Sequence, residues 1–90
     1  MPKFRKKPVV IDAWQLTEES FNQHVPDWLS EAFKDYRVWV DPIDGPAISI
    51  MTLDGTLQRA DLGDWIIRGV KGELYPCKPD IFAATYEPAE

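Results

Sequence analysis

The sequence predicts an α+β fold: one N-terminal strand, one kinked or broken helix, and then an antiparallel meander sheet. Apolar residues recur at helical spacing only between positions 17 and 34, whereas short apolar runs separated by turn residues fill the chain after position 36. We expect the sheet to be strongly bent, to the extent of a half-open barrel, with the helix on one face. At 90 residues, the chain is expected to form a single domain, 1–90.

The first strand is predicted over 8–16, PVVIDAWQL. Val9, Ile11 and Ala13 would share one face of it, because successive side chains of a strand point to opposite sides. Pro8 stands at the start of this strand, where a missing N–H does little harm.

The helix is predicted to begin at Thr17, whose hydroxyl makes a good N-cap, and acidic residues follow in its first turn. Pro26 falls inside the helical pattern, where a proline costs about 3 kcal/mol. We therefore expect either a kink at Pro26 or a second helical piece that opens there and covers about 26–34.

The remaining strands are expected at 37–41, 47–53, 56–62, 65–70 and 73–76, with turn residues at 42–46, 63–64 and 71–72. Asp54-Gly55 predicts a two-residue hairpin turn in which both residues have positive φ. The segment PDIFAAT, which opens with Pro79, resembles one helical turn, and TYEP at 85–88 is a candidate last edge strand.

The formal net charge of −5 is unevenly distributed along the chain. Positions 3–7, KFRKK, hold four of the ten basic residues, so the rest of the chain carries six basic and fifteen acidic side chains, a net charge of −9. General nucleic-acid binding is not expected, because the neutralisation of phosphates needs a basic face. The basic run itself is typical of a solvated lead-in to a first strand.

Cysteine and apolar content indicate where the protein resides. Cys77 is the only cysteine, so no internal disulfide can form, which fits a reducing cytoplasm. The sequence has no apolar run long enough for a membrane span and no signal-peptide pattern at its start. Four Trp in so short a chain are difficult to bury completely, so at least one is expected at a ligand site, a subunit contact or a half-exposed surface position.

The stretch 63–82, GDWIIRGVKGELYPCKPDIF, contains the best candidates for a binding site. Its glycines and prolines suit turns and stiff extended backbone, whereas a second group of residues is not required for folding: Trp65, Arg68, Lys71, Tyr75, Cys77, Lys78 and Asp80. Aromatic rings beside a guanidinium are suited to an anionic or nucleotide-like ligand. Arg68 and Lys71 would converge only if the turn brought them together, and the alternative is a solvated hairpin tip.

Catalysis is less well supported by the sequence. His24 could in principle act with Cys77 as a nucleophile pair, but a histidine on the flank of a helix is typical of a solvated surface position. One His and one Cys fall short of the ligands that a zinc site requires. The chain also lacks a phosphate-binding loop and a serine elbow. We therefore expect no catalytic residue, no metal and no cofactor.

Two motifs resemble a family of small phage and prophage proteins. They are FRKKPVVIDAWQ at 4–15 and GDWIIRGVKGELYPCKPDIFAATYEP at 63–88, which together cover nearly half of the chain. Leu62 stands where the family pattern has Pro, and Trp65 where it has Tyr. The resemblance implies a phage or prophage origin and the cytoplasm of a bacterial host, but no mechanism.

Three functions follow from these observations as hypotheses. The first is a non-enzymatic binder of a host protein or an anionic small ligand through 63–82. The second is a homo-oligomeric assembly accessory, with an interface that uses the tryptophans. The third is a small enzyme with Cys77 or a carboxylate as its reactive group.

Overall fold

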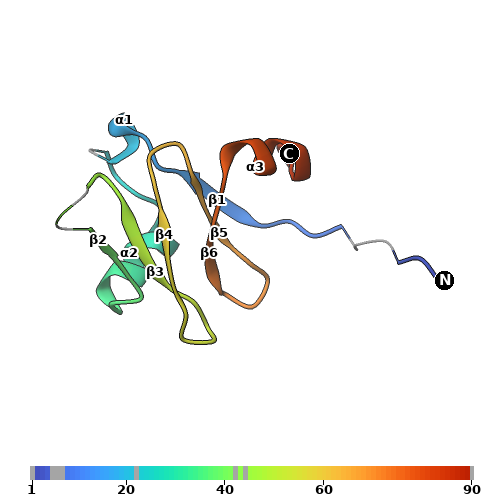
Figure 1. The fold of residues 1–90 in the computed structure, drawn as a ribbon, viewed down its shortest axis with the longest axis horizontal. Coiled ribbons are helices and arrows are strands. Elements are labelled where there is room, and N and C mark those ends of the chain that lie inside the picture. Colours follow the sequence, from blue (N-terminus) through green and yellow to red (C-terminus); the bar gives the residue numbers. More distant parts are fainter. Residues whose placement is uncertain (1, 5–7, 22, 42, 44, 90) are drawn as a thin grey trace.

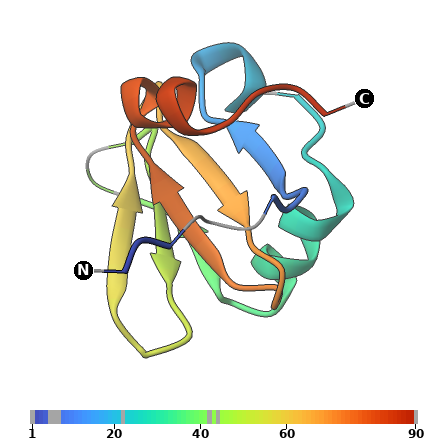
Figure 2. The ribbon, with the colours of Figure 1, turned by 90° about the vertical axis from the view of Figure 1, so that its right-hand side faces the viewer.

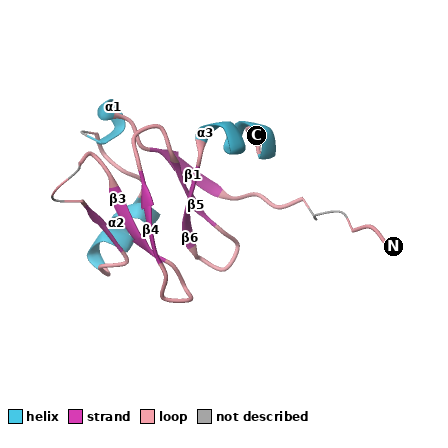
Figure 3. Ribbon diagram, in the orientation of Figure 1, coloured by secondary structure: helices cyan, strands magenta, loops and turns pink. Residues whose placement is uncertain are grey.

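The computed structural model describes residues 2–4, 8–21, 23–41, 43 and 45–89. Its elements are β1 (Asp12–Gln15), α1 (Glu18–Phe21), α2 (Asp27–Lys34), β2 (Val38–Val40), β3 (Ile48–Met51), β4 (Leu57–Ala60), β5 (Trp65–Arg68), β6 (Leu74–Cys77) and α3 (Pro79–Thr85) (Figures 1 and 3). The predicted α+β class is confirmed. Parts of the predicted loop at 42–46 and of the basic run at 3–7 lie outside the described residues.

The described strands form two antiparallel three-stranded sheets, in the orders β1-β5-β6 and β2-β3-β4. The predicted single meander is therefore wrong between β4 and β5, and the two sheets do not close or curl into a barrel. The N–H of Leu16 donates to the carbonyl of Asp64 (2.9 Å), and the N–H of Gly63 donates to that of Leu16 (2.7 Å). These bonds connect the end of β1 to the turn before β5. Strand β1 therefore pairs with the edge of β5 with which β4 would pair in a meander.

The predicted break in the helical segment is confirmed at Pro26. The Thr17 hydroxyl accepts the N–H of Ser20 (2.9 Å), and the Ser20 hydroxyl accepts the N–H of Thr17 (2.8 Å), so the start of α1 is capped reciprocally. Pro26 has an extended backbone, φ −61° and ψ 155°, and is the N-cap of α2. The second helix therefore starts immediately after the proline, where the ring removes no helical hydrogen bond.

The main core lies between the two sheets and α2. Its buried members come from both sheets, from α2 and from the end of β1: Leu16, Leu29, Ala32, Val38, Ile48, Ile50, Ala60, Ile66 and Leu74. All four tryptophans are half-buried rather than fully buried, and Trp14 and Trp28 pack against this core.

Two local predictions are wrong. The connection between β3 and β4 is a longer loop rather than a two-residue turn, and only Gly55 in it has positive φ (85°). The Asp54 carboxylate accepts hydrogen bonds from the Thr52 hydroxyl and the Thr56 N–H, which holds Asp54 itself in an ordinary conformation. The chain after α3 is not an edge strand, because the N–H of Tyr86 bonds back to Phe82 and ends the helix there.

Candidate binding site

The register of the β1-β5-β6 sheet separates the predicted site residues onto two faces. Trp65 lies opposite Cys77, and Ile67 lies opposite Tyr75, so all four side chains belong to one face. Arg68 is displaced from Trp65 by three positions and therefore belongs to the other face, which carries Ile66 and Leu74 toward the core. The structure thus brings Trp65, Tyr75 and Cys77 together and leaves Arg68 apart from them.

Helix α3 covers the face that carries Trp65 and Tyr75. The ring of Phe82 is stacked on Trp65, with centroids 4.0 Å apart and an interplanar angle of 6°. Tyr86 lies 5.1 Å from Phe82, and its hydroxyl is 3.4 Å from that of Tyr75. Phe82 and Tyr86 are four residues apart, so they project from the same side of the helix end. The predicted helical turn thus closes an aromatic cluster over the sheet.

Ile67 is the buried residue of this face, whereas Trp65, Tyr75 and Cys77 are half-buried. Ile67 is fully buried, although it lies on the opposite side of the sheet from the main core. Burial raises the pKa of the Tyr75 phenol, and its contact with the Tyr86 hydroxyl raises it further. The Tyr75 phenol therefore stays protonated near neutral pH.

A groove of about 660 Å³ lies between the extended segment that leads into β1 and helix α3 with the residues that follow it. Its apolar lining includes Val9, Ile11, Trp65, Ala83, Tyr86 and Pro88. We call this feature the α3 groove. In Figure 1 the N-terminal segment leaves the body beneath α3, and in Figure 2 the chain after α3 runs across the same side of the molecule.

The three cations that the sequence selected, Arg68, Lys71 and Lys78, do not form one cationic site. Two nitrogens of Arg68 donate to Asp12, at 3.1 and 2.5 Å, and its guanidinium also lies 5.8 Å from the ring centroid of Trp28. The Lys71 backbone N–H donates to the carboxylate of Glu73 (2.9 Å) in the hairpin between β5 and β6. Because Arg68 ends β5 at this hairpin and Lys78 follows the far end of β6, these two cations do not converge.

Lys78 belongs to a carboxylate network that the sequence did not reveal. Its ammonium lies 3.0 Å from Asp64 and 3.8 Å from Asp61, and the same Asp64 oxygen accepts the N–H of Asp61 (2.9 Å). Asp64 is only 3% exposed. The bond to Asp64 raises the pKa of Lys78. This network ties the turn between β4 and β5 to the start of α3, and no spacing rule in the sequence links position 64 to position 78.

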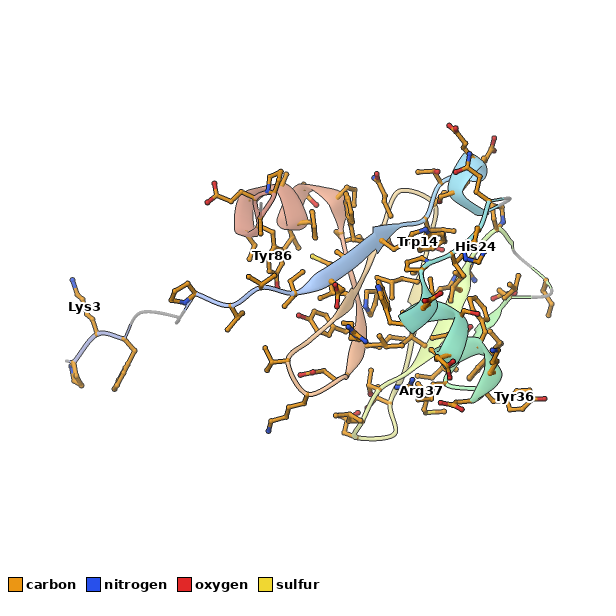
Figure 4. All side chains as sticks on the ribbon, turned by 180° about the vertical axis from the view of Figure 1, so that it is seen from behind. Lys3, Trp14, His24, Tyr36, Arg37 and Tyr86 are labelled. Carbon is orange, nitrogen blue, oxygen red and sulfur yellow. The ribbon has the colours of Figure 1, made fainter. Side chains whose placement is uncertain are left out.

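Cys77 is a poor nucleophile in this structure. Burial raises the pKa of its thiol, and the nearby carboxylates of Asp64 and Asp80 raise it further. His24, for which the sequence favoured a solvated surface position over a role beside Cys77, is exposed in the segment between α1 and α2 (Figure 4). Asp80 is exposed in the first turn of α3.

In the described part of the chain, no three His, Cys, Asp or Glu side chains are grouped so that they could hold a metal ion. No helix among the same residues has the length and apolar character needed to cross a membrane. Comparison with family models, curated proteins and solved structures found no match to this chain.

Proposed function

We propose that this protein is a non-enzymatic binding module that holds an apolar segment of a partner protein in the α3 groove. The observation that carries the proposal is the groove itself, an apolar and aromatic surface between an extended strand and a helix. Its volume is within the range of about 300–1,000 Å³ that is typical of binding pockets. Trp65, a residue that the sequence selected, forms part of it.

The charges around the groove favour a protein segment over an anionic small ligand. The charged residues of its lining are Asp12, which is paired with Arg68, and the acidic Glu87. Arg68 and Lys78, which could have attracted an anion, are both bonded to carboxylates. A partner segment with apolar side chains and a basic residue beside them matches this surface best.

Two further points support binding rather than catalysis in a bacterial host. The raised pKa of Cys77 keeps the chain's single thiol protonated at neutral pH. The resemblance of both terminal motifs to small phage proteins favours a host protein as the partner.

A second candidate function, homo-oligomeric assembly, is favoured by the unpaired edge of β1 and by the basic N-terminal arm.

The proposed function can be tested with two neighbouring residues of α3. Ala83 lines the groove, whereas Ala84 is exposed and lies outside its lining. A photo-crosslinking side chain at position 84, beside the groove, would capture the partner from a bacterial extract, and the purified partner would then be titrated against the Ala83→Arg and Ala84→Arg variants. Ala83→Arg should weaken binding by about tenfold or more, because it fills the groove, and Ala84→Arg should bind as the parent does. Equal affinities for the two variants would show that the groove is not the binding surface.

A further inference from the structure

Strand β1 has one paired edge and one open edge. It lies at the border of its sheet, with β5 on one side. The N–H and C=O of Leu16 point toward the β5 side, and in an antiparallel ladder such groups alternate along the strand. The backbone N–H and C=O groups of Trp14 and Asp12 therefore point toward β5 as well. Those of Ala13 point away from β5, and so do those of Ile11 and Val9, where the extended backbone continues.

The outward-pointing groups are available over a limited stretch. The outward carbonyl of Gln15 already accepts the Ser20 hydroxyl (2.7 Å). Among the described residues, no backbone group outside the sheet bonds to positions 8–13. Val9 and Val10, which lie within this stretch, are 47% and 78% exposed. An apolar open edge of this kind readily accepts a further strand.

The charge distribution indicates what that strand is. Lys3 lies far from the body of the molecule, at the end of the N-terminal arm (Figure 4). The Lys3 ammonium is therefore too distant to neutralise the acidic remainder of the same copy. The first turn of α1, just beyond the other end of β1, carries Glu18 and Glu19. In an antiparallel pair of identical strands, the basic arm of each copy would run toward these acids of the other.

We propose that two copies of this chain pair through residues 9–13 as antiparallel strands, with the two-fold axis at Ile11. This register places Val9 opposite Ala13 of the second copy and uses all of the outward groups that are still available. A shift of the axis to Asp12 would set two carboxylates directly opposite each other, which is destabilising. A shift to Ala13 would require the carbonyl of Gln15, which is already bonded to Ser20.

The pairing joins the β1-β5-β6 sheets of the two copies into one continuous sheet. A two-fold axis within a flat antiparallel pair runs perpendicular to the sheet, so both copies keep α3 on the same face. The two α3 grooves then lie side by side, floored by the paired β1 segments. The inference rests on the open strand edge and on charge, so it is independent of the partner proposed above.

Disulfide trapping tests this register directly, in a Cys77→Ser background. In the proposed dimer the two Ile11 Cα atoms lie about 5.5 Å apart, within reach of a disulfide, whereas Val10 faces Asp12 and the two Val10 positions are offset beyond about 7 Å. Ile11→Cys should therefore crosslink at least about tenfold faster than Val10→Cys under mild oxidation. Val10 is the matched control, because it is the more exposed of the two positions. Equal rates, or faster crosslinking of Val10→Cys, would overturn the pairing.

Charge reversal tests the proposed attraction between the basic residues at 3–7 of one copy and Glu18 and Glu19 of the other. Glu18→Lys with Glu19→Lys should weaken dimerisation by about tenfold or more at low salt, as measured by sedimentation equilibrium over a concentration series. Reversal of the four basic residues at 3–7 in the same chain should restore the dimer. A parent protein that stays monomeric throughout the series would overturn the proposal, and so would a failure of this rescue.

Discussion

The outer faces of the two sheets differ in whether a helix covers them. On the β1-β5-β6 sheet, α3 covers the outer face and leaves Ile67 fully buried. On the β2-β3-β4 sheet, no described helix covers the corresponding face, where Met51 and Leu57 are 40% and 55% exposed. Behind the β1-β5-β6 sheet, Ile67 and the stacked rings of Trp65 and Phe82 form a second, small core, although no residue of the seven-residue α3 is itself buried.

The exposed face of β2-β3-β4 is stabilised by neighbouring side chains instead of a helix. Ser49 lies between Trp39 on one neighbouring strand and Arg59 on the other, and it is only 9% exposed. Arg59 also bonds to Asp41 (3.2 Å) and Asp61 (2.8 Å). Exposed ion pairs of this kind contribute at most about 1 kcal/mol each. The face is thus a solvated antiparallel surface, as is common when one side of a sheet carries the core.

The largest expected effect tests whether the second core is as important as the first. Ile66 and Ile67 are adjacent and both fully buried, but they point to opposite faces of β5. Ile67→Ala should lower the free energy of unfolding by about 2–4 kcal/mol, close to the loss for Ile66→Ala, whereas Leu57→Ala should cost less than about 1 kcal/mol. Urea denaturation would measure all three. If Ile67→Ala were as mild as Leu57→Ala, α3 would be only loosely docked.

The next largest expected effect distinguishes the side of α3 that faces the sheet from the side that faces solvent. Phe82 is stacked on Trp65, whereas Ile81 beside it is 55% exposed. Phe82→Ala should cost about 2–3 kcal/mol, because it removes both buried ring area and the stacking contact. Ile81→Ala should change the stability by less than about 0.5 kcal/mol. A similar loss in both variants would mean that α3 contributes through its helical backbone and not through this ring pair.

The sequence predicted local structure well and the association of strands less well. The cap at Thr17, the break at Pro26 and the helix that starts at Pro79 all depend on neighbouring residues, and all three are confirmed. The position of β1 beside β5, which a meander would give to β4, depends on a four-residue ladder and on two further backbone hydrogen bonds of Leu16 with the turn at 63–64. No local sequence pattern encodes these distant contacts.

The same distinction holds for the candidate site. Trp65 and Tyr75 were selected from the sequence as aromatic residues beside cationic ones, and their position on one face follows from the register of β5 and β6. The acids that neutralise Arg68 and Lys78 could not be identified, since Asp12 lies 56 positions from Arg68 along the chain and Asp64 lies 14 from Lys78. Fifteen acidic residues offered too many alternative partners for spacing alone to decide among them.

A smaller effect on stability is expected at the connection between α2 and β2. Tyr36, which follows α2, has a φ of 59° and is 83% exposed. The N–H of Arg37 bonds to the carbonyl of Ala32 (3.0 Å), as in helix ends where glycine is usual. Tyr36→Gly should therefore raise the free energy of unfolding by about 1 kcal/mol, because the left-handed conformation no longer strains a side chain. The urea midpoint should rise without a change in slope, while Tyr36→Ala should show no such gain.

The smallest effect is a pH dependence in the loop between β3 and β4. The hydrogen bond from the Thr52 hydroxyl, together with those from Thr56, lowers the pKa of Asp54 below its ordinary value. A lowered pKa in the folded state means that the carboxylate adds stability above the unfolded pKa of about 3.9 and loses it as the pH falls through the folded value. Asp54→Asn should accordingly be less stable than the parent at pH 7, and the difference should vanish in strong acid. Denaturation at a series of pH values would measure it, and a difference that stayed constant down to the lowest pH would show that the charge of Asp54 contributes nothing to the loop.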